Sequence, residues 1–261
     1  MKNKVINFYG CSFTDGGGLD INEYFDYAFE KGLTQINASD GTDHLHQYRR
    51  ENRFSTLVGK HFDCEVNNFA QTGNNNDNIV QKVHRNLSDN RGDIHIVQFS
   101  FYSRQKVYFD DTGEFYRLNS LETLKSKKLL YNYYKSFIRY HYKVEYEQYK
   151  VKMYIDMLDS YVKSKSKTIY WMFWDIIPNG MFKYKDVDEW TESNGEFEEG
   201  TLDLTINTDN LISFPPDGYM QMWAKVNKLL ISGETDGKID DCHLSQKGNG
   251  EVAKIIIEVL S

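Results

Sequence analysis

Short apolar segments alternate with amphipathic segments along most of the chain. Four segments have the length and composition of buried strands, namely residues 4–9, 64–70, 93–99 and 167–175. Apolar residues at helical spacing predict helices over residues 53–62, 79–87, 218–231 and 248–260. Alternation of strand and helix is typical of a parallel sheet with helices on both faces. We therefore predict an α/β fold with a doubly wound parallel sheet, a three-layer sandwich flanked by helices.

Three further segments, at about 16–50, 105–165 and 176–217, are longer than the connections that this alternation of strands and helices needs. The first is polar and has three glycines at its start. The second includes a Lys- and Tyr-rich stretch that predicts one or two long helices, either solvated or in an oligomer contact. The third is acidic and loop-like, with Trp190 among the aromatic residues that could stack on a sugar or simply fasten the loop. No repeat or linker is found, so we predict one domain, residues 1–261, with three helical or loop insertions.

Composition narrows the class of protein. Hydrophobic residues make up 40% of the 261 residues and charged residues 26%, as in soluble globular domains. The net charge of −7 argues against wholesale binding of nucleic acid, although a local basic patch stays open. No apolar run is long enough to span a membrane, and the N-terminus does not resemble a signal peptide. These features predict a cytoplasmic protein without membrane contact, with a virion-associated protein as the alternative.

The three cysteines, Cys11, Cys64 and Cys242, lack the spacing of a metal site. An odd number without a secretory signal indicates reduced thiols in a cytosol. A regulatory disulfide between Cys11 and Cys242 is a speculative alternative. We predict no metal and no organic cofactor.

The segment VINFYGCSFTDGGG, residues 5–18, carries the candidate chemistry. No Lys follows its glycines as a P-loop requires, and their spacing does not fit G-x-G-x-x-G. A Ser at the end of a first strand lies at the loop edge of the sheet, so Ser12 is a candidate nucleophile if a base takes its proton. Cys11 is the alternative nucleophile.

A base is available near the C-terminus of the chain. In Asp240-Asp241-Cys242-His243, the D-x-x-H spacing lets the Asp240 carboxylate reach and orient the His243 imidazole. Asp241 is the rival carboxylate. A metal site is the weaker interpretation, because no second ligand cluster accompanies these residues. Oxyanion donors are also needed, and the loop NNFAQTGNNNDN offers the backbone N–H of Gly73.

These segments resemble, in order, the conserved blocks of the SGNH (GDSL-type) hydrolases. GCSFTDG, residues 10–16, is similar to the first block, with Cys11 where Asp is usual. Asn68 and Gly73 are similar to the second block, and DDCHLSQKGNGEVA, residues 240–253, to the last. The third block departs, because no Asn follows the strand at 93–99. Ser100 is the substitute oxyanion donor, and Arg104 would support that loop.

The resemblance implies an esterase or deacetylase acting on O-acyl groups, with a small-molecule or carbohydrate ester as substrate. Ser12, His243 and Asp240 would form the triad, and Ser12, Gly73 and Ser100 the oxyanion hole. Asn75 and Arg104 are the candidate substrate-binding residues, although an Asn run is more often a loop. The alternatives are a non-catalytic binding or structural protein on the same fold, and an O-acyltransferase.

Overall fold

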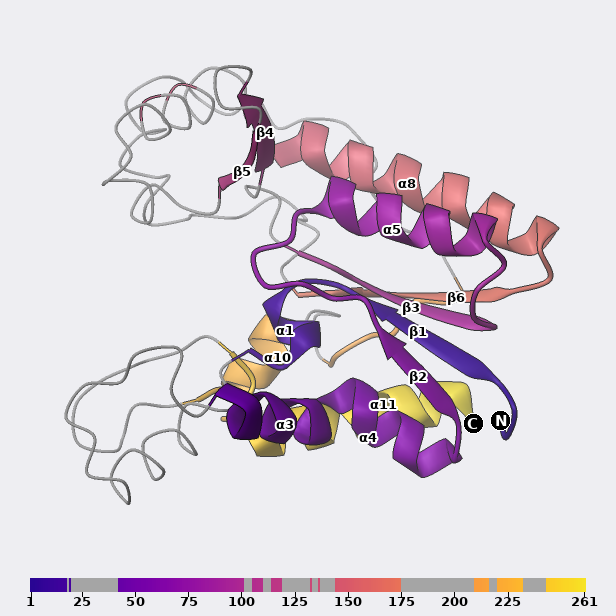
Figure 1. The fold of residues 1–261 in the computed structure, drawn as a ribbon, viewed down its shortest axis with the longest axis vertical. Coiled ribbons are helices and arrows are strands. Elements are labelled where there is room, and N and C mark those ends of the chain that lie inside the picture. The colour runs from indigo at the N-terminus through magenta and orange to yellow at the C-terminus, as the bar shows by residue number, and fades with distance from the viewer. Residues whose placement is uncertain are drawn as a thin grey trace.

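Four parallel strands form the central sheet of the computed structural model, in the order β2–β1–β3–β6 (Figure 1). The strand bounds are Val5–Tyr9 for β1, Glu65–Asn68 for β2, Ile94–Phe99 for β3 and Thr168–Phe173 for β6. All three strand pairs are parallel, and each strand lies within its predicted range. The structure describes residues 1–17, 19, 42–100, 105–109, 114–118, 132, 136, 144–174, 209–215, 220–231 and 243–261.

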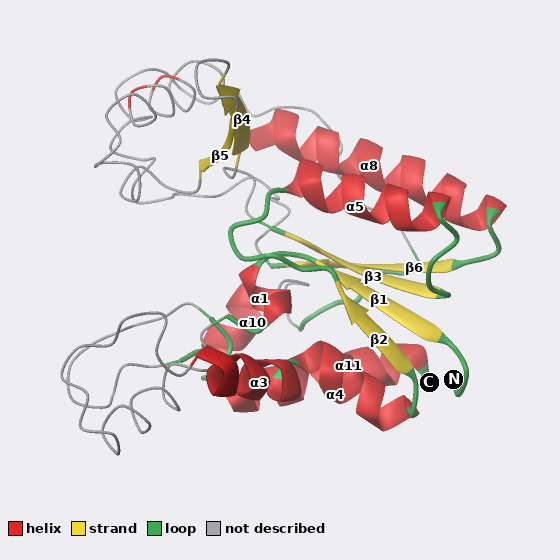
Figure 2. Ribbon diagram, in the orientation of Figure 1, coloured by secondary structure: helices red, strands yellow, loops and turns green. Residues whose placement is uncertain are grey.

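Helices cover both faces of this sheet, as Figure 2 shows, and the predicted three-layer α/β fold is confirmed. One face carries α3 (Thr42–Asn52), α4 (Phe54–Phe62) and α11 (Gln246–Leu260). The other face carries α5 (Asn76–Ser88) and α8 (Val144–Ser164). Two short helices, α1 (Ser12–Asp15) and α10 (Met220–Val226), lie toward the carboxyl ends of the strands. An antiparallel hairpin of β4 (Gln105–Phe109) and β5 (Glu114–Leu118) stands apart from the sheet.

Alternating side chains of the strands feed two separate cores. On the face of α4 and α11 the core contains Ile6, Phe8 and Ile96, all at most 1% exposed. On the face of α5 and α8 it contains Tyr9, Val97 and Trp171. Neighbouring residues of one strand, such as Phe8 and Tyr9, thus belong to different cores. Side chains that alternate in this way between two buried faces are typical of a strand covered on both sides.

The chain reverses its direction of travel across the sheet after β2. From β1 it moves to β2 at one edge, and then returns past β1 to β3. Ligands of open α/β sheets bind outside the carboxyl ends of the strands at such a switch point. The residues that follow β1 and β3 are therefore the first to consider as a site. Both chain termini lie at the opposite edge of the sheet (Figure 1).

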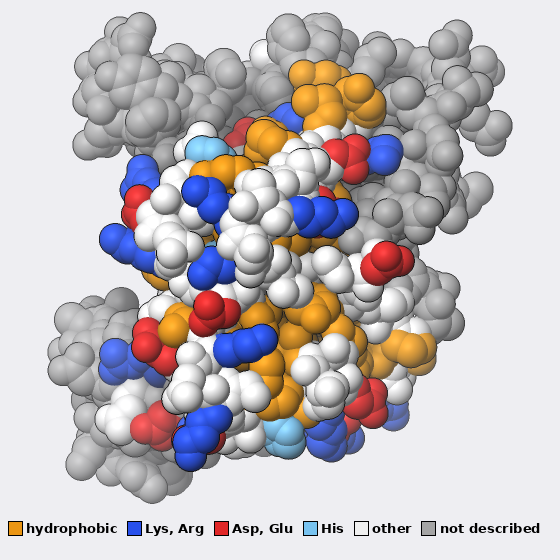
Figure 3. Space-filling view, turned by 90° about the vertical axis from the view of Figure 1, so that its right-hand side faces the viewer, with side chains coloured by type: hydrophobic (Ala, Val, Ile, Leu, Met, Phe, Trp, Pro, Cys, Tyr) orange, Lys and Arg blue, Asp and Glu red, His pale blue; other side chains and the backbone are white. Residues whose placement is uncertain are grey.

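That opposite edge faces the viewer in Figure 3. Lys and Arg side chains alternate there with Asp and Glu, and the described residues show no broad area of one sign. Hydrophobic side chains also lie between these charged groups, near the middle of the view.

The prediction of a helix over 218–231 is wrong at its C-terminal end. Helix α10 ends at Val226, Lys228 takes a positive φ of 53°, and Leu230 pairs antiparallel with Leu244. The apolar residues after 228 thus belong to an extended segment, because pairing with a distant segment overrides local helical spacing. Of the insertions, α3 lies mostly in the first, β4, β5 and α8 lie in the second, and most of the remainder lies outside the described residues.

A short extended segment at Leu211 pairs with β6 at the edge of the sheet. Leu211 bridges Trp171 in parallel, with Trp171 N–H donating to Asn210 O at 3.0 Å and Ile212 N–H to Trp171 O at 2.9 Å. Trp171 and Trp174 are fully buried, which confirms that the aromatic strand belongs to the core.

Candidate active site

Ser12 lies on the first turn after β1, at the carboxyl edge of the sheet. It is the first residue of α1, and its side chain is buried at 3% exposure. Helix α1 ends at once because Gly16 has φ 81°, a left-handed conformation that favours glycine. Gly17 N–H then donates to Ser12 O at 2.6 Å and folds the chain back over the serine.

Gly17 lies between Ser12 and His243. A Cβ at Gly17 would be 3.1 Å from Ser12 Cβ and 3.1 Å from His243 Nε2. The two catalytic candidates, 231 residues apart in sequence, are therefore separated by no more than twice that distance. No described residue makes a hydrogen bond to the Ser12 hydroxyl, and catalytic hydrogen bonds often tighten only when substrate binds.

The His243 ring rests on an aromatic stack. Its centroid is 4.9 Å from that of Phe13, and Phe13 stacks on Trp174 with centroids 3.4 Å apart and planes within 11°. Trp174 ends the described part of the chain after β6 and is fully buried. The residue after the candidate nucleophile thus packs against the imidazole, a contact that sequence reasoning missed.

Backbone pairing holds the segment that carries His243. Ile231 N–H donates to His243 O at 3.0 Å, and Ser245 N–H donates to Leu229 O at 2.8 Å. The Ser245 hydroxyl caps α11 by accepting from Gly248 N–H at 3.1 Å, and it also donates to Leu229 O at 2.8 Å. A Cβ at Gly248 would collide with that same carbonyl oxygen, so the close approach requires glycine.

Asn249 joins this segment to the start of α4. Its Oδ1 accepts from Phe54 N–H at 3.1 Å, while its Nδ2 donates to Leu244 O at 3.3 Å and Ser245 O at 3.1 Å. The side chain is 1% exposed, so each of these hydrogen bonds replaces one that water would supply. Asn249 therefore anchors the residues that follow His243.

The loop after β2 lies against the turn of the candidate nucleophile. Gln71 N–H and Asn74 Nδ2 both donate to Gly10 O at 3.2 Å, two residues before Ser12. Gly73 is buried and has φ 72°, the positive value that the turn requires. Neither the Gly73 N–H nor the Ser12 N–H donates a hydrogen bond within the described part of the chain.

Ser100 follows β3 at the same edge and is 3% exposed. Its backbone is held from both sides by Asn76, whose Oδ1 accepts from Ser100 N–H at 2.7 Å and whose Nδ2 donates to Ser100 O at 3.2 Å. The hydroxyl is therefore the group of Ser100 that could act as a third donor. In sequence Asn76 suggests either a contact to substrate hydroxyls or a loop residue, and its support of Ser100 was not predicted.

The Asn75 side chain has a structural partner. Its Oδ1 accepts from Asn78 N–H at 3.0 Å and so caps α5.

Asp240, Asp241 and Arg104 lie outside the described residues, so the carboxylate of the triad and the support of the Ser100 loop stay predictions.

A cluster of charged side chains around Asp15, the last residue of α1, holds this helix against the neighbouring helices. Asp15 lies 3.5 Å from Arg53 Nη1 and 3.8 Å from Arg49 Nη1, and Thr72 Oγ1 donates to it at 3.4 Å. Burial lowers the pKa of Arg53, an effect that the Asp15 carboxylate partly offsets. The cluster was not anticipated, because nothing in sequence links residues 15 and 53.

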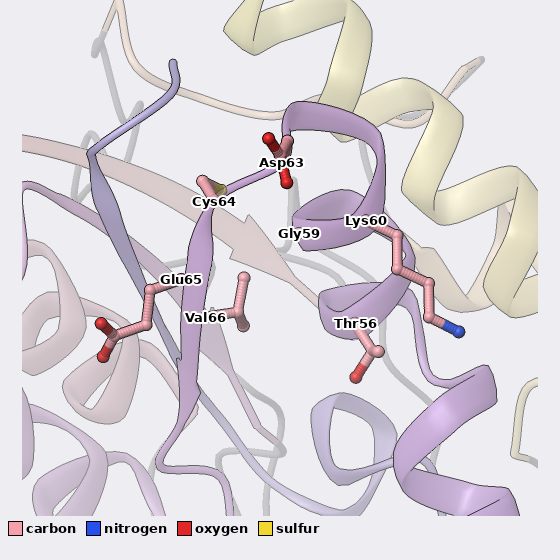
Figure 4. A pocket seen from close by; sticks show the side chains of 7 residues that line it. All are labelled: Thr56, Gly59, Lys60, Asp63, Cys64, Glu65 and Val66. Carbon is pink, nitrogen blue, oxygen red and sulfur yellow. The ribbon is translucent and has the colours of Figure 1, made fainter.

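A separate open hollow of about 550 Å³ lies between α4 and the start of β2 (Figure 4). It is lined by residues of α4, including Thr56 and Lys60, and by the segment from Asp63 to Val66, and the Glu65 side chain points away from α4. This hollow is at the amino end of the edge strand, so it is not part of the Ser12 site.

Within the described ranges no group of three or more His, Cys, Asp or Glu could hold a metal ion. No helix of those ranges has both the length and the apolarity to cross a membrane.

Comparison with family models and with curated proteins finds no match to this sequence. Among solved structures, the chain is similar to a psychrotrophic esterase from Pseudoalteromonas sp., with 9% identity, a TM-score of 0.46 and coverage of 99% of this chain and 97% of that one. It is also similar to a catalytic mutant of an acetylxylan esterase from Geobacillus stearothermophilus (11% identity, TM-score 0.46, coverage 100% and 95%). An α/β hydrolase enzyme from the metagenome of Lake Arreo gives 11% identity, a TM-score of 0.47 and coverage of 99% and 95%.

Proposed function

We propose that this chain is a serine ester hydrolase of the SGNH type, acting on O-acyl groups of a small molecule or carbohydrate. One observation carries the proposal: Ser12 and His243 both lie against Gly17, where an added Cβ would be 3.1 Å from Ser12 Cβ and 3.1 Å from His243 Nε2, at the carboxyl edge of a parallel sheet. The sequence resemblance supports the choice of an ester as substrate. A soluble, cytoplasmic enzyme is the corresponding expectation for its location.

The proposed reaction begins with attack of Ser12 Oγ on the ester carbonyl, while His243 Nε2 accepts the hydroxyl proton. The backbone N–H groups of Ser12 and Gly73, with the Ser100 hydroxyl, would stabilise the negative oxygen of the tetrahedral intermediate. Collapse of that intermediate breaks the bond to the alcohol, which leaves with the proton from His243. Asp240 would orient the imidazole throughout.

The second half of the reaction regenerates the serine. Water, deprotonated by His243, attacks the acyl group on Ser12, and the acid leaves as the serine takes back its proton. Each step uses only side chains and backbone N–H groups of this chain. An alcohol in place of water would make the same site an acyltransferase.

The test is hydrolysis of p-nitrophenyl acetate by the purified chain, beside Ser12→Ala and Cys11→Ala. Cys11 is the matched control, because it is the adjacent buried residue and the alternative nucleophile. We expect turnover by the wild type and Cys11→Ala and none above background by Ser12→Ala. Labelling by a fluorophosphonate, followed by peptide mapping, should locate the adduct on Ser12. Failure of all three proteins to turn over, with Ser12 unlabelled, would leave the non-catalytic binding protein as the better explanation.

A further inference from the structure

One buried amide on β3, that of Gln98, supports the turn of the candidate nucleophile. Gln98 is 1% exposed. Its Oε1 accepts from Thr14 Oγ1 at 2.9 Å and from the Cys11 backbone N–H at 3.4 Å, and the Cys11 thiol lies 3.5 Å from the same oxygen. Its Nε2 donates to Phe99 O at 2.7 Å. These contacts lie on both sides of Ser12 in the sequence.

The orientation of this amide follows from its partners. The Cys11 N–H can only donate and the Phe99 carbonyl can only accept. A reversed amide would set donor against donor at Cys11 and acceptor against acceptor at Phe99, in a site that excludes water. Gln98 therefore has one stable orientation, with its oxygen under α1.

Helix α1 has no cap of its own. Cys11 occupies the N-cap position and makes no side-chain capping bond, where Ser, Thr, Asp or Asn would usually accept from the backbone. Gln98, on a neighbouring strand, instead accepts from the N–H of Cys11 itself and from the Thr14 hydroxyl, and so ties both ends of this short helix to β3. Room for it depends on Gly10, because a Cβ there would lie 2.7 Å from Gln98 Oε1 and would collide with Thr14.

We propose that Gln98 is a positioning residue, which holds the turn on either side of Ser12 so that its hydroxyl can reach His243 and its N–H stays available. This inference rests on the proposed function of Ser12. It also accounts for Cys11 where the resembled block carries Asp. An Asp carboxylate at position 11 would meet Gln98 Oε1, another acceptor, whereas the Cys11 thiol offers a donor.

The experiment compares Gln98→Met with Asn7→Leu. Met has a similar length without hydrogen-bonding groups, and Asn7 is a matched control: a fully buried amide on β1 that donates to Arg91 O on the far side of the sheet. Two quantities are measured, the second-order rate of fluorophosphonate labelling at Ser12 and the hydrogen exchange of the peptide containing residues 10–14. For Gln98→Met we expect labelling roughly 100-fold slower, the cost of a misplacement of about 1 Å, and faster exchange. For Asn7→Leu we expect neither change.

A third variant, Gln98→Glu, separates positioning from simple destabilisation. A neutral carboxyl has one donor and one acceptor and can replace the amide, whereas the ionised form has no donor for Phe99 O. Burial raises the pKa of a carboxyl, so the neutral form is accessible in mild acid. The ratio of the variant's labelling rate to that of the wild type should therefore rise as the pH is lowered. A purely structural defect would leave that ratio flat.

The outcomes are distinguishable. Equal labelling of wild type and Gln98→Met overturns the inference and leaves the proposed function intact. Absence of labelling in the wild type overturns the proposed function. In that case the exchange data still decide whether Gln98 holds the turn, because faster exchange in Gln98→Met supports it and unchanged exchange refutes it.

Discussion

Gln98 and His95 lie three residues apart on β3 and face opposite sides of the sheet. Both are buried, but their surroundings differ. Gln98 lies beneath α1 at the carboxyl edge, and both ends of its amide are hydrogen-bonded. His95 lies under α5, where Nδ1 is 3.0 Å from the Tyr9 hydroxyl and Nε2 has no hydrogen-bond partner in the described part of the chain.

The two faces therefore respond differently to pH. Burial lowers the pKa of His95 to about 4 and raises that of Tyr9 to about 12, so both groups are neutral near pH 7. With Asn86 Nδ2 donating to the Tyr9 oxygen at 3.2 Å, the Tyr9 O–H donates to His95 Nδ1. An amide cannot titrate. The hydrogen bonds of Gln98 therefore do not depend on its own ionisation, whereas protonation of His95 on the opposite face opposes folding in acid.

The largest effect should come from removal of the candidate nucleophile. It lies on the face of the sheet that carries α4 and α11, which we call the site face. Ser12→Ala removes the candidate nucleophile and leaves both cores unchanged. If the chain is a serine hydrolase, its kcat for p-nitrophenyl acetate should fall by roughly 10⁶-fold, as for triad members that act as one unit. The urea midpoint should stay near that of the wild type. Residual turnover close to the wild-type rate would contradict the assignment.

The next effect is the loss of stability in acid on the opposite face. The unfolded chain takes up a proton at an ordinary histidine pKa near 6.5, whereas folded His95 resists until about pH 4. The contribution of His95 is therefore complete above pH 6.5 and is lost as the pH falls toward 4, by about 3 kcal/mol in total. Urea unfolding of wild type and His95→Gln across this range measures it. Gln keeps an acceptor for Tyr9 and cannot titrate, so its curve should be flatter, and parallel curves would contradict the assignment.

A comparable loss is expected on the site face without any dependence on pH. Asn249→Leu leaves Phe54 N–H and the carbonyls of Leu244 and Ser245 without their buried partner. The free energy of unfolding should fall by about 2–4 kcal/mol. Lys254→Ala on the same helix is the control, because its ion pair with Glu251 is exposed and should be worth less than about 1 kcal/mol. Equal urea midpoints for the two variants would show that Asn249 does not anchor the His243 segment.

The smallest effect sharpens the comparison of faces. Tyr9→Phe removes the hydroxyl that links Asn86 to His95 and should cost roughly 1–2 kcal/mol of stability. Fluorophosphonate labelling of Ser12 should be unchanged, since Tyr9 faces α5. A double-mutant cycle with His95→Gln should give a coupling energy of about 0.5 kcal/mol or more, because the two side chains share a hydrogen bond. Slower labelling would mean that the faces are not independent.

Much of the fold could be predicted because local pattern and tertiary position agree in the sheet. The runs at 4–9, 93–99 and 167–175 are buried on both faces, so their continuous apolar character identifies strands directly. The end of α10 could not be predicted, because Leu230 pairs with a residue 14 positions further along the chain. Local spacing carries no information about such a partner.

In the candidate site, sequence alone predicted the residues with reactive groups, Ser12 and His243, through the order of short motifs. The tertiary structure decided what lies between and beneath them: Gly17 between the two side chains, the Phe13 stack, and the amides of Gln98, Asn76 and Asn249. Reactive groups are recognisable by type and spacing. A buried amide in a strand or helix has no such signature, because its role depends on which backbone groups other segments bring within 3 Å of it.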